Sequence, residues 1–381
     1  MEDLTLRDYF REYYLKNAVK IPDLLFKREI GYIPFSGSMI RHRMYNNNVE
    51  IENFIKRTVP RHLYYSSAYY NFPDKTKMVE KEWLGAELIF DLDADHIENA
   101  DKMTYEQILE EVKKHTKRLL GTLINDFGFN ESNIHLYFSG GRGYHVHVES
   151  DKIYTLDSDA RREIGDYIKI EGINIEDLKT LDDSHFNYGI LKKLNKYISD
   201  FFTDINDENI HKLLGKNTNN YIKHLDKFFG GKKLIEFFKD TKGNKFKIID
   251  TFDKLNNNEY NKTMLTYLLN QFKKEALAEI DEPVSTDIHR LIRFPLSLHG
   301  KTGLMVKPLL ISDLNKFKPL NEGIPEIFKG VEKKINLTID KFEINMDNQH
   351  FKLEKGINNV PLYLAIFTNA INVSEFIDKK Y

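Results

Sequence analysis

The stretches AELIFDLD (86–93) and IHLYFSGGRGYHVHVE (134–149) carry the clearest structural pattern in this chain of 381 residues. The first is a short apolar run that ends in acidic residues, which is typical of a buried strand. The second contains two alternating runs joined by a glycine-rich turn, which predicts a β-hairpin. Between them, apolar residues from 108 to 127 recur at helical spacing, and Thr104 with Gln107 matches a capping box.

The order strand, helix, strand, strand indicates a palm of mixed helices and strands. Residues 155–275 differ, because they combine helical periodicity with Asn-rich loops. Strand signals return after residue 283 in LIRFPLSL and LMVKPLLI. We therefore predict an α+β fold. A discontinuous catalytic palm (1–154 and 276–381) is built on a mixed or antiparallel sheet with flanking helices, and residues 155–275 form a mostly helical insertion.

The two ends of the chain carry weaker signals. Residues 6–19 have the spacing of an opening helix, and residues 335–344 alternate like a strand. A last helix is expected to open at Pro361, because proline suits the first helical turn.

Composition excludes several classes of protein. The chain has 26 Phe and 21 Tyr, too many for a disordered chain. It has no cysteine, which excludes disulfides, thiolate zinc sites and cysteine nucleophiles. The formal charge of −2 does not by itself indicate a nucleic-acid partner. Since no stretch approaches the roughly 18 apolar residues of a membrane span, we expect a cytoplasmic protein without a membrane segment.

Two acidic residues, Asp91 and Asp93, end the first apolar run, and Asp95 follows them. Side chains alternate faces along a strand, so Asp91 and Asp93 are expected on the same side. Two neighbouring carboxylates repel each other and favour a hard divalent cation such as Mg²⁺ or Mn²⁺. The alternative is that DLDAD is only the polar end of a strand.

The predicted hairpin turn reads Ser139-Gly-Gly-Arg142-Gly. Glycines allow backbone N–H groups to approach an anion closely, and Arg142 adds a planar charge suited to phosphate oxygens. We interpret the turn as a cradle for a triphosphate. His145 and His147 follow on one strand face, and this spacing also occurs in metal sites, so a zinc or iron site stays open as an alternative.

A third polar segment, IDEPVSTDIHRLIRFPLSLHGKTG, spans residues 280–303. Polar groups at this density beside a buried run are costly unless each other or a ligand satisfies them. Asp281 is a candidate third carboxylate, and Arg293, His299 and Lys301 are candidates for contact with a polyphosphate. A solvated basic loop with ion pairs is the alternative.

In order and spacing, ELIFDLDAD, YFSGGRGYHVHV and DEPVSTDIHRLIRFPLSLHGKTG resemble the catalytic small subunit of archaeal and eukaryotic DNA primases. The family places a histidine eighteen residues beyond its third aspartate, and here 299 − 281 = 18. The resemblance implies that Asp91, Asp93 and Asp281 are the catalytic residues and the ligands of Mg²⁺ or Mn²⁺. The residues that it places at the nucleotide are Ser139, Arg142, His145, Arg293, His299 and, from an N-terminal His42-Arg43 pair, Arg43.

The chain departs from the family pattern in two places. Family members usually carry a cysteine zinc site shortly after the DxD pair. This chain has no cysteine, and His96 and His115 alone do not replace such a site, so we expect no structural zinc. Eukaryotic members have a second basic residue where this chain has Gly141, so phosphate contact there falls to the backbone amide or is lost.

The resemblance implies a DNA-templated nucleotidyltransferase that synthesises short RNA primers from NTPs by two-metal phosphoryl transfer, with dNTPs and DNA primers left open. It also implies a heterodimer with a primase large subunit and a single-stranded DNA template. Template binding needs a basic surface, and residues 211–247 carry ten Lys against three acidic residues, an excess of 10 − 3 = +7. A solvated helical face is the alternative for that segment.

Three other functions compete with this interpretation. A stand-alone primase-polymerase of DNA repair or end joining would lack the large subunit, so co-purification separates it. A glycosyltransferase with a DxD pair would not need the third aspartate. A nucleic-acid-binding replisome component with a vestigial site is disfavoured because all three carboxylates are intact.

Overall fold

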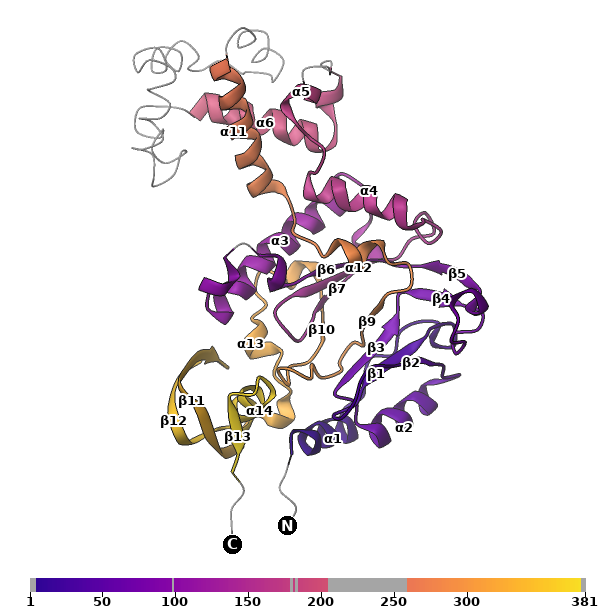
Figure 1. Ribbon diagram of the computed structural model, residues 1–381, viewed down its shortest axis with the longest axis vertical. Helices are drawn as coiled ribbons and strands as arrows, with labels where there is room; N and C mark the ends of the chain where they lie inside the picture. The colour runs from indigo at the N-terminus through magenta and orange to yellow at the C-terminus, as the bar shows by residue number, and fades with distance from the viewer. Residues whose placement is uncertain (1–4, 98, 179–180, 182–183, 205–258, 378–381) are drawn as a thin grey trace. The chain divides into compact units, whose positions relative to one another are not determined.

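The computed structural model describes residues 5–97, 99–178, 181, 184–204 and 259–377 (Figure 1). The chain divides into two compact units. The first comprises Met1–Lys117, Phe129–Gly165 and Glu279–Tyr381, and the second comprises Arg118–Gly128 and Asp166–Ala278. All candidate catalytic and nucleotide residues belong to the first unit. The basic segment 211–247 lies outside the described residues, and the insertion boundaries at 155 and 275 stay a prediction.

The first unit contains a four-stranded antiparallel sheet of order β2-β1-β3-β9. Its strands are β1 (Ile30–Ile33), β2 (Ile40–Arg43), β3 (His62–Ser66) and β9 (Leu291–Arg293). Two helices, α1 (Leu6–Lys16) and α2 (Asn48–Thr58), lie next to this sheet (Figure 1). The aromatic side chains of α1, including Phe10 and Tyr14, are buried, because they occupy one face of the helix.

A second antiparallel sheet, of order β10-β7-β8-β6, contains residues 88–92 of the first opening stretch and the two strands of the second. Its strands are β6 (Leu88–Leu92), β7 (Ile134–Phe138), β8 (Tyr144–Val148) and β10 (Lys307–Leu309). Strands β7 and β8 form the predicted hairpin, so that prediction is confirmed. The capping box is also present, because the Gln107 N–H donates to Thr104 Oγ1 at 3.3 Å and the Thr104 N–H donates to Gln107 Oε1 at 2.8 Å. The helix that it opens is α3 (Tyr105–Asn125).

The apolar run at 86–93 is not one strand. Strand β5 (Trp83–Ala86) pairs with β4 (Ala68–Tyr70) in a two-stranded sheet, and β6 begins at Leu88. Between them, the Glu87 N–H donates to the Ser67 carbonyl at 3.1 Å. The run therefore belongs to two sheets in succession, and the division falls at Glu87, which the sequence pattern places within one apolar strand.

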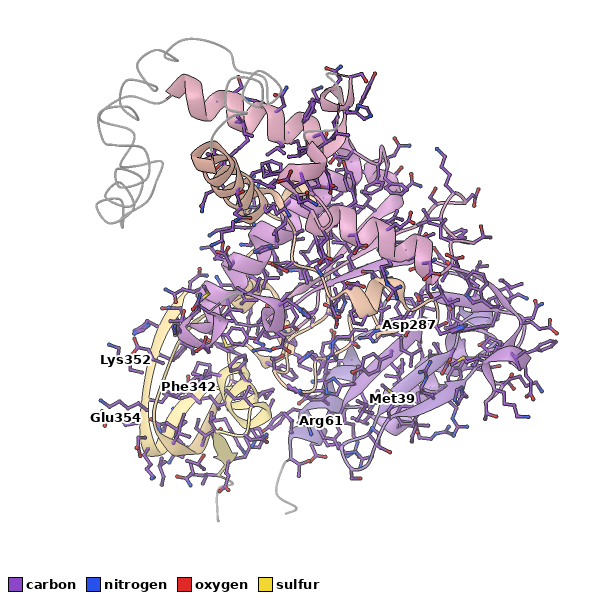
Figure 2. All side chains as sticks on the ribbon, turned by 45° about the horizontal axis from the view of Figure 1, so that its top comes forward. Met39, Arg61, Asp287, Phe342, Lys352 and Glu354 are labelled. Carbon is purple, nitrogen blue, oxygen red and sulfur yellow. The ribbon has the colours of Figure 1, made fainter. Side chains whose placement is uncertain are left out.

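The C-terminal part of the first unit is a long ribbon with a helix packed on it. Strands β11 (Glu332–Met346) and β12 (Gln349–Pro361) pair over most of their length, and β13 (Ser374–Phe376) joins β11. Figure 2 shows Lys352 and Glu354 pointing outward from this ribbon, and both are exposed. Helix α14 (Leu362–Ala370) begins after Pro361, which is its N-cap rather than its first helical residue.

The remaining elements are short or belong to the second unit. Short helices of the first unit are α12 (Glu282–Thr286) and α13 (Pro319–Glu322), and α4 (Ser158–Lys169) begins there. The second unit contains α5 (Ile175–Leu178), α6 (Gly189–Asp204) and α11 (Glu259–Ala276). The 3₁₀ turns are η1 (Leu25–Lys27), η2 (Met78–Lys81), η3 (Ala94–His96), η4 (Ala100–Lys102), η5 (Glu131–Asn133), η6 (His185–Asn187), η7 (Ile311–Asp313) and η8 (Glu326–Phe328). Within the described ranges, every helix is too short or too polar to cross a bilayer.

Candidate active site

The DxD pair lies where β6 ends. Asp91 is on the strand and faces His145 of β8 across the ladder, with His145 Nε2 3.6 Å from Asp91 Oδ1. Asp93 follows the last residue of the strand and is the N-cap of η3. The side-chain alternation expected along a strand therefore applies to Asp91, whereas Asp93 already lies in the adjoining turn.

The third carboxylate comes from a distant part of the sequence. The backbone N–H of Asp281 donates a hydrogen bond of 2.8 Å to the carbonyl oxygen of Asp91. Asp281 is also the N-cap of α12. Burial, together with the nearby charges of Asp93 and Asp281, raises the pKa of Asp91 to about 7. The three carboxylates therefore share one electrostatic environment.

The donor set fits a hard divalent cation. Asp93 Oδ1 is buried and has no hydrogen-bond partner, although Arg142 Nη2 lies 3.5 Å away, so a ligand that satisfied this oxygen would be favourable. Carboxylate oxygens are the ligands that Mg²⁺ and Mn²⁺ prefer. In the described part of the chain, no three side chains of the types His, Cys, Asp or Glu already converge as a metal cluster. Mutual repulsion of the three carboxylates opposes such convergence until a cation neutralises them.

The glycine-rich hairpin turn is held in a defined shape. The Ser139 N–H donates to the Gly143 carbonyl at 3.0 Å, and the Gly141 N–H donates to Ser139 Oγ at 3.2 Å. Gly140 has a φ of 75°, which favours glycine. At Gly143, a Cβ atom would lie 1.9 Å from the carbonyl oxygen of Leu92. The turn therefore lies directly against the end of β6, beside the DxD pair.

Arg142 projects from this turn toward the acidic residues. Its Nη2 atom is 2.5 Å from Asp95 Oδ1 and 3.5 Å from Asp93 Oδ1. Asp95 belongs to η3, and its side chain is 74% exposed. The arginine proposed for phosphate thus pairs with carboxylates in this structure.

The third motif packs against the same turn. A Cβ atom on Gly140 would lie 2.8 Å from His299 Cβ, and one on Gly141 would lie 3.1 Å from His299 Nε2. The Thr302 hydroxyl donates to the Gly140 carbonyl at 2.5 Å. Only glycine allows the two loops to approach so closely. The structure thus brings the hairpin turn that carries Ser139 and Arg142 against the loop of His299.

Arg293 is held by a histidine that sequence reasoning missed. Its Nη1 atom donates to His62 Nδ1 at 2.7 Å, and its guanidinium lies 5.3 Å from the centroid of the Tyr64 ring. Burial and the neighbouring cation Arg293 lower the pKa of His62 to about 3. His62 is therefore neutral at physiological pH, as its role as hydrogen-bond acceptor requires.

His299 shares this environment. Its ring meets the His62 ring edge to face, with centroids 5.3 Å apart. Burial and then the charge of Arg293 lower the pKa of His299 well below its usual range. The cationic side of the site therefore relies on arginine, while its imidazoles are uncharged donors or acceptors.

Two further residues support the hairpin turn and were also missed. The Tyr105 hydroxyl donates to the Gly141 carbonyl at 2.8 Å, and Thr302 contacts Gly140 as described. Tyr105 carries only the signal of a first helical residue after a capping box, and His62 lies in an ordinary strand pattern. Thr302 lies in the polar segment 280–303 that the sequence pattern singles out, so its segment, though not the residue itself, could be found from the sequence.

The two histidines of the HxH pair face different carboxylates. His145 approaches Asp91, whereas His147 Nδ1 lies 3.2 Å from Glu87 Oε2 and 3.4 Å from the Tyr65 hydroxyl. Glu87 in turn pairs with the buried Arg28. The second histidine is thus part of a buried ion network behind the site.

Arg43 and Lys301 are less closely connected with the site. Arg43 is exposed at the end of β2, the outer strand of its sheet. Of the hydrogen bonds and ion pairs among the described residues, none joins Arg43 to the three carboxylates or to Arg293. Lys301 is exposed next to His299. Arg61, labelled in Figure 2, holds the same loop, because its Nε donates to the Gly300 carbonyl at 3.0 Å.

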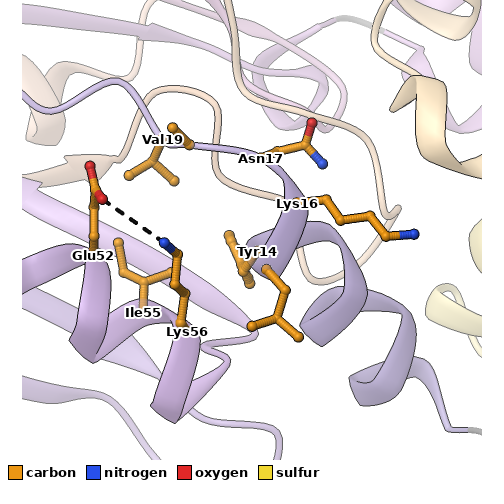
Figure 3. Close-up of a pocket in the computed structure, with 9 residues that line it drawn as sticks. Tyr14, Lys16, Asn17, Val19, Glu52, Ile55 and Lys56 are labelled. Carbon is orange, nitrogen blue, oxygen red and sulfur yellow. Dashed lines mark ion pairs between the residues drawn. The ribbon is translucent and has the colours of Figure 1, made fainter.

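A separate pocket of 220 Å³ lies between the end of α1 and α2 (Figure 3). Its lining includes Tyr14, Asn17 and Ile55, and an ion pair of 4.0 Å between Glu52 and Lys56 borders it. It contains none of the candidate catalytic or nucleotide residues, so we do not assign the chemistry to it.

Comparison with known proteins agrees with the geometry. The family model described as DNA primase small subunit matches residues 90–311. A relative from Picrophilus torridus, named DNA primase small subunit PriS, is 52% identical over 375 residues, covering 98% of each chain. Proteins of the same name from Thermoplasma volcanium (36% identical, 98% of this chain and 97% of the relative) and Methanococcoides burtonii (35% identical, 97% of each) also match.

The α+β fold and the family match are those of a nucleotidyltransferase. The chain belongs to the DNA primase small-subunit family. It is the catalytic subunit of a DNA primase, an enzyme that synthesises primers for DNA replication. The resemblance noted in the sequence is thus confirmed.

Proposed function

We propose that Asp91, Asp93 and Asp281 hold two divalent cations, Mg²⁺ or Mn²⁺, during primer synthesis. In this reaction a 3′-hydroxyl attacks the α-phosphorus of an NTP, the new phosphodiester bond forms, and pyrophosphate leaves. Bound cations would lower the pKa of that hydroxyl and offset the negative charge of the transition state. The observation that supports this proposal most is the 2.8 Å hydrogen bond from the Asp281 backbone N–H to the Asp91 carbonyl oxygen.

We further propose that the triphosphate lies against the hairpin turn and the His299 loop. Arg142 and Arg293 would donate to phosphate oxygens, and Ser139 and the Gly141 backbone would shape the turn that receives them. Neutral His62 keeps the Arg293 guanidinium in place through its 2.7 Å hydrogen bond. His145 and His299, both buried, would border the phosphates as uncharged groups. These residues position the nucleotide and exclude water rather than react with it.

The partners and setting belong to the same proposal. The relatives are named small subunits, which supports a heterodimer with a primase large subunit. We propose single-stranded DNA as template, NTPs with or without dNTPs as substrates, a cytoplasmic location, a palm of residues 1–154 and 276–381, and a helical insertion at 155–275. Arg43 is retained as a nucleotide contact on the family resemblance alone.

Template-dependent incorporation of labelled NTP and dNTP on single-stranded DNA tests the proposal, with Mg²⁺ or Mn²⁺ and with or without the large subunit. We expect incorporation that requires both the template and the cation. Incorporation without template, or none with the large subunit present, would contradict it. Full activity without a co-purifying large subunit would favour the stand-alone alternative.

A further inference from the structure

The turn η3, which follows the DxD strand, contacts both a cationic and an acidic residue of the site. From η3, Asp95 lies 2.5 Å from Arg142 Nη2, and His96 Nε2 lies 4.0 Å from Asp281 Oδ1. Ala94, between Asp93 and Asp95, is buried and anchors the turn. An acid therefore faces the phosphate-binding arginine, and an imidazole faces the third carboxylate.

The contact between Asp95 and Arg142 uses the same guanidinium edge that a phosphate would need. A carboxylate and a phosphate both offer oxygens to the N–H groups of arginine, so the two ligands compete for Arg142 Nη2. Asp93 Oδ1 lies farther away, at 3.5 Å, so Asp95 provides the shorter contact. Nucleotide binding through Arg142 Nη2 must therefore compete with Asp95.

We propose that Asp95 is a positioning residue that holds Arg142 away from the triphosphate and lowers the affinity of the site for nucleotide. This inference rests on the proposed role of Arg142 as a phosphate contact. Because Asp95 and Arg142 are both partly exposed, their pairing is weak enough for a triphosphate with its bound cation to break it.

Calorimetric titration of the full-length protein with ATP and Mg²⁺ tests this competition. Asp95→Asn keeps the size of the side chain and removes its charge, so we expect the Kd for ATP to fall by about two- to fivefold, the range typical of an exposed ion pair. In steady-state assays the KM should fall by a similar factor while kcat stays unchanged. Asp95→Ala should also lower the Kd and the KM for ATP.

A matched control separates competition from the general field of one negative charge. Asp101→Asn removes the same charge from the exposed turn η4, and we expect no change in Kd. Asp95→Asn should also leave the Kd for ATP unchanged when Arg142 is already replaced by Ala, because the guanidinium for which Asp95 and phosphate compete is then absent. An equal gain in Asp101→Asn, or a gain that persists without Arg142, would overturn the proposal.

Failure of this inference can be distinguished from failure of the proposed function. If Arg142→Ala weakens ATP binding but Asp95→Asn leaves it unchanged or weaker, Asp95 does not compete and only this inference is overturned. If Arg142→Ala itself leaves ATP binding unchanged, the phosphate role of Arg142 is wrong, and the inference that rests on it is overturned as well.

Discussion

The backbone N–H of Asp281 donates a 2.8 Å hydrogen bond to the carbonyl oxygen of Asp91. This one contact joins the segment before α12 to the end of β6, and it brings Asp281 to the DxD pair. Because it uses backbone atoms, it fixes the position of Asp281 without consuming any carboxylate oxygen. The Asp281 side chain is therefore not used in joining these two segments.

Arg293 is expected to contribute to nucleotide binding and not to template binding. Arg293→Ala should raise the KM for NTP or lower kcat, with a loss in kcat/KM of about ten- to hundredfold, because a charge-assisted contact to phosphate is removed. DNA affinity, measured by fluorescence anisotropy, should stay nearly unchanged. His147→Ala is the comparison variant. If His147→Ala eliminated metal and nucleotide binding while Arg293→Ala titrated like the wild type, an HxH metal site would replace the geometry described above.

The stability of the protein should depend on pH through His62. Its pKa is about 3 in the folded state against an ordinary value of 6.5, so the unfolded chain binds a proton that the folded one excludes. The contribution of neutral His62 is present above pH 6.5 and is lost progressively as the pH falls toward 3. In urea unfolding at pH 7.5, 6 and 5, the free energy of unfolding should therefore fall less with decreasing pH for His62→Asn than for the wild type. Parallel losses in the two proteins would contradict this prediction.

The buried ion network behind the site should be sensitive to removal of one partner. Glu87 and Arg28 are each about 1% exposed, and despite burial, Arg28 and His147 hold the pKa of Glu87 at about 2. Glu87→Ala would leave Arg28 charged and unpaired, so we expect a loss of about 3–5 kcal/mol in the free energy of unfolding. Glu12→Ala, which breaks an exposed pair with Lys16, should change it by less than about 1 kcal/mol. Equal effects in denaturant unfolding would show that burial of the first pair has no energetic consequence.

Gly143 should tolerate no side chain. A methyl group there would overlap the Leu92 carbonyl at 1.9 Å, so Gly143→Ala must move the hairpin turn away from the end of β6. We expect a destabilisation of about 1–3 kcal/mol and a loss of nucleotide incorporation. Gly121→Ala, in helix α3, would place its methyl group 3.9 Å from Asn125 Nδ2 and should be neutral or slightly stabilising. Thermal unfolding with parallel incorporation assays checks both variants, and normal activity in Gly143→Ala would refute the close approach.

The sequence was sufficient to predict the hairpin, the capping box at Thr104 and the α+β class, because each follows from local periodicity or turn chemistry. It was insufficient for His62 and Tyr105. Their contacts with Arg293 and Gly141 arise in the tertiary structure, and nothing in their local patterns marks them. The division of the 86–93 run between two sheets was missed for the same reason, since pairing with β4 is not encoded in the run itself.

The central claim is that Asp91, Asp93 and Asp281 hold the catalytic cations, and Asp93→Ala tests it most directly. Manganese binding followed by electron paramagnetic resonance should weaken strongly, and template-dependent NTP incorporation should fall to the background level, while thermal unfolding shows an intact fold. Removing one of three repelling carboxylates should not destabilise the protein. Asp101→Ala, in the exposed turn η4, should behave like the wild type. Retention of more than about a tenth of wild-type incorporation, or unchanged Mn²⁺ binding, in Asp93→Ala would contradict the assignment.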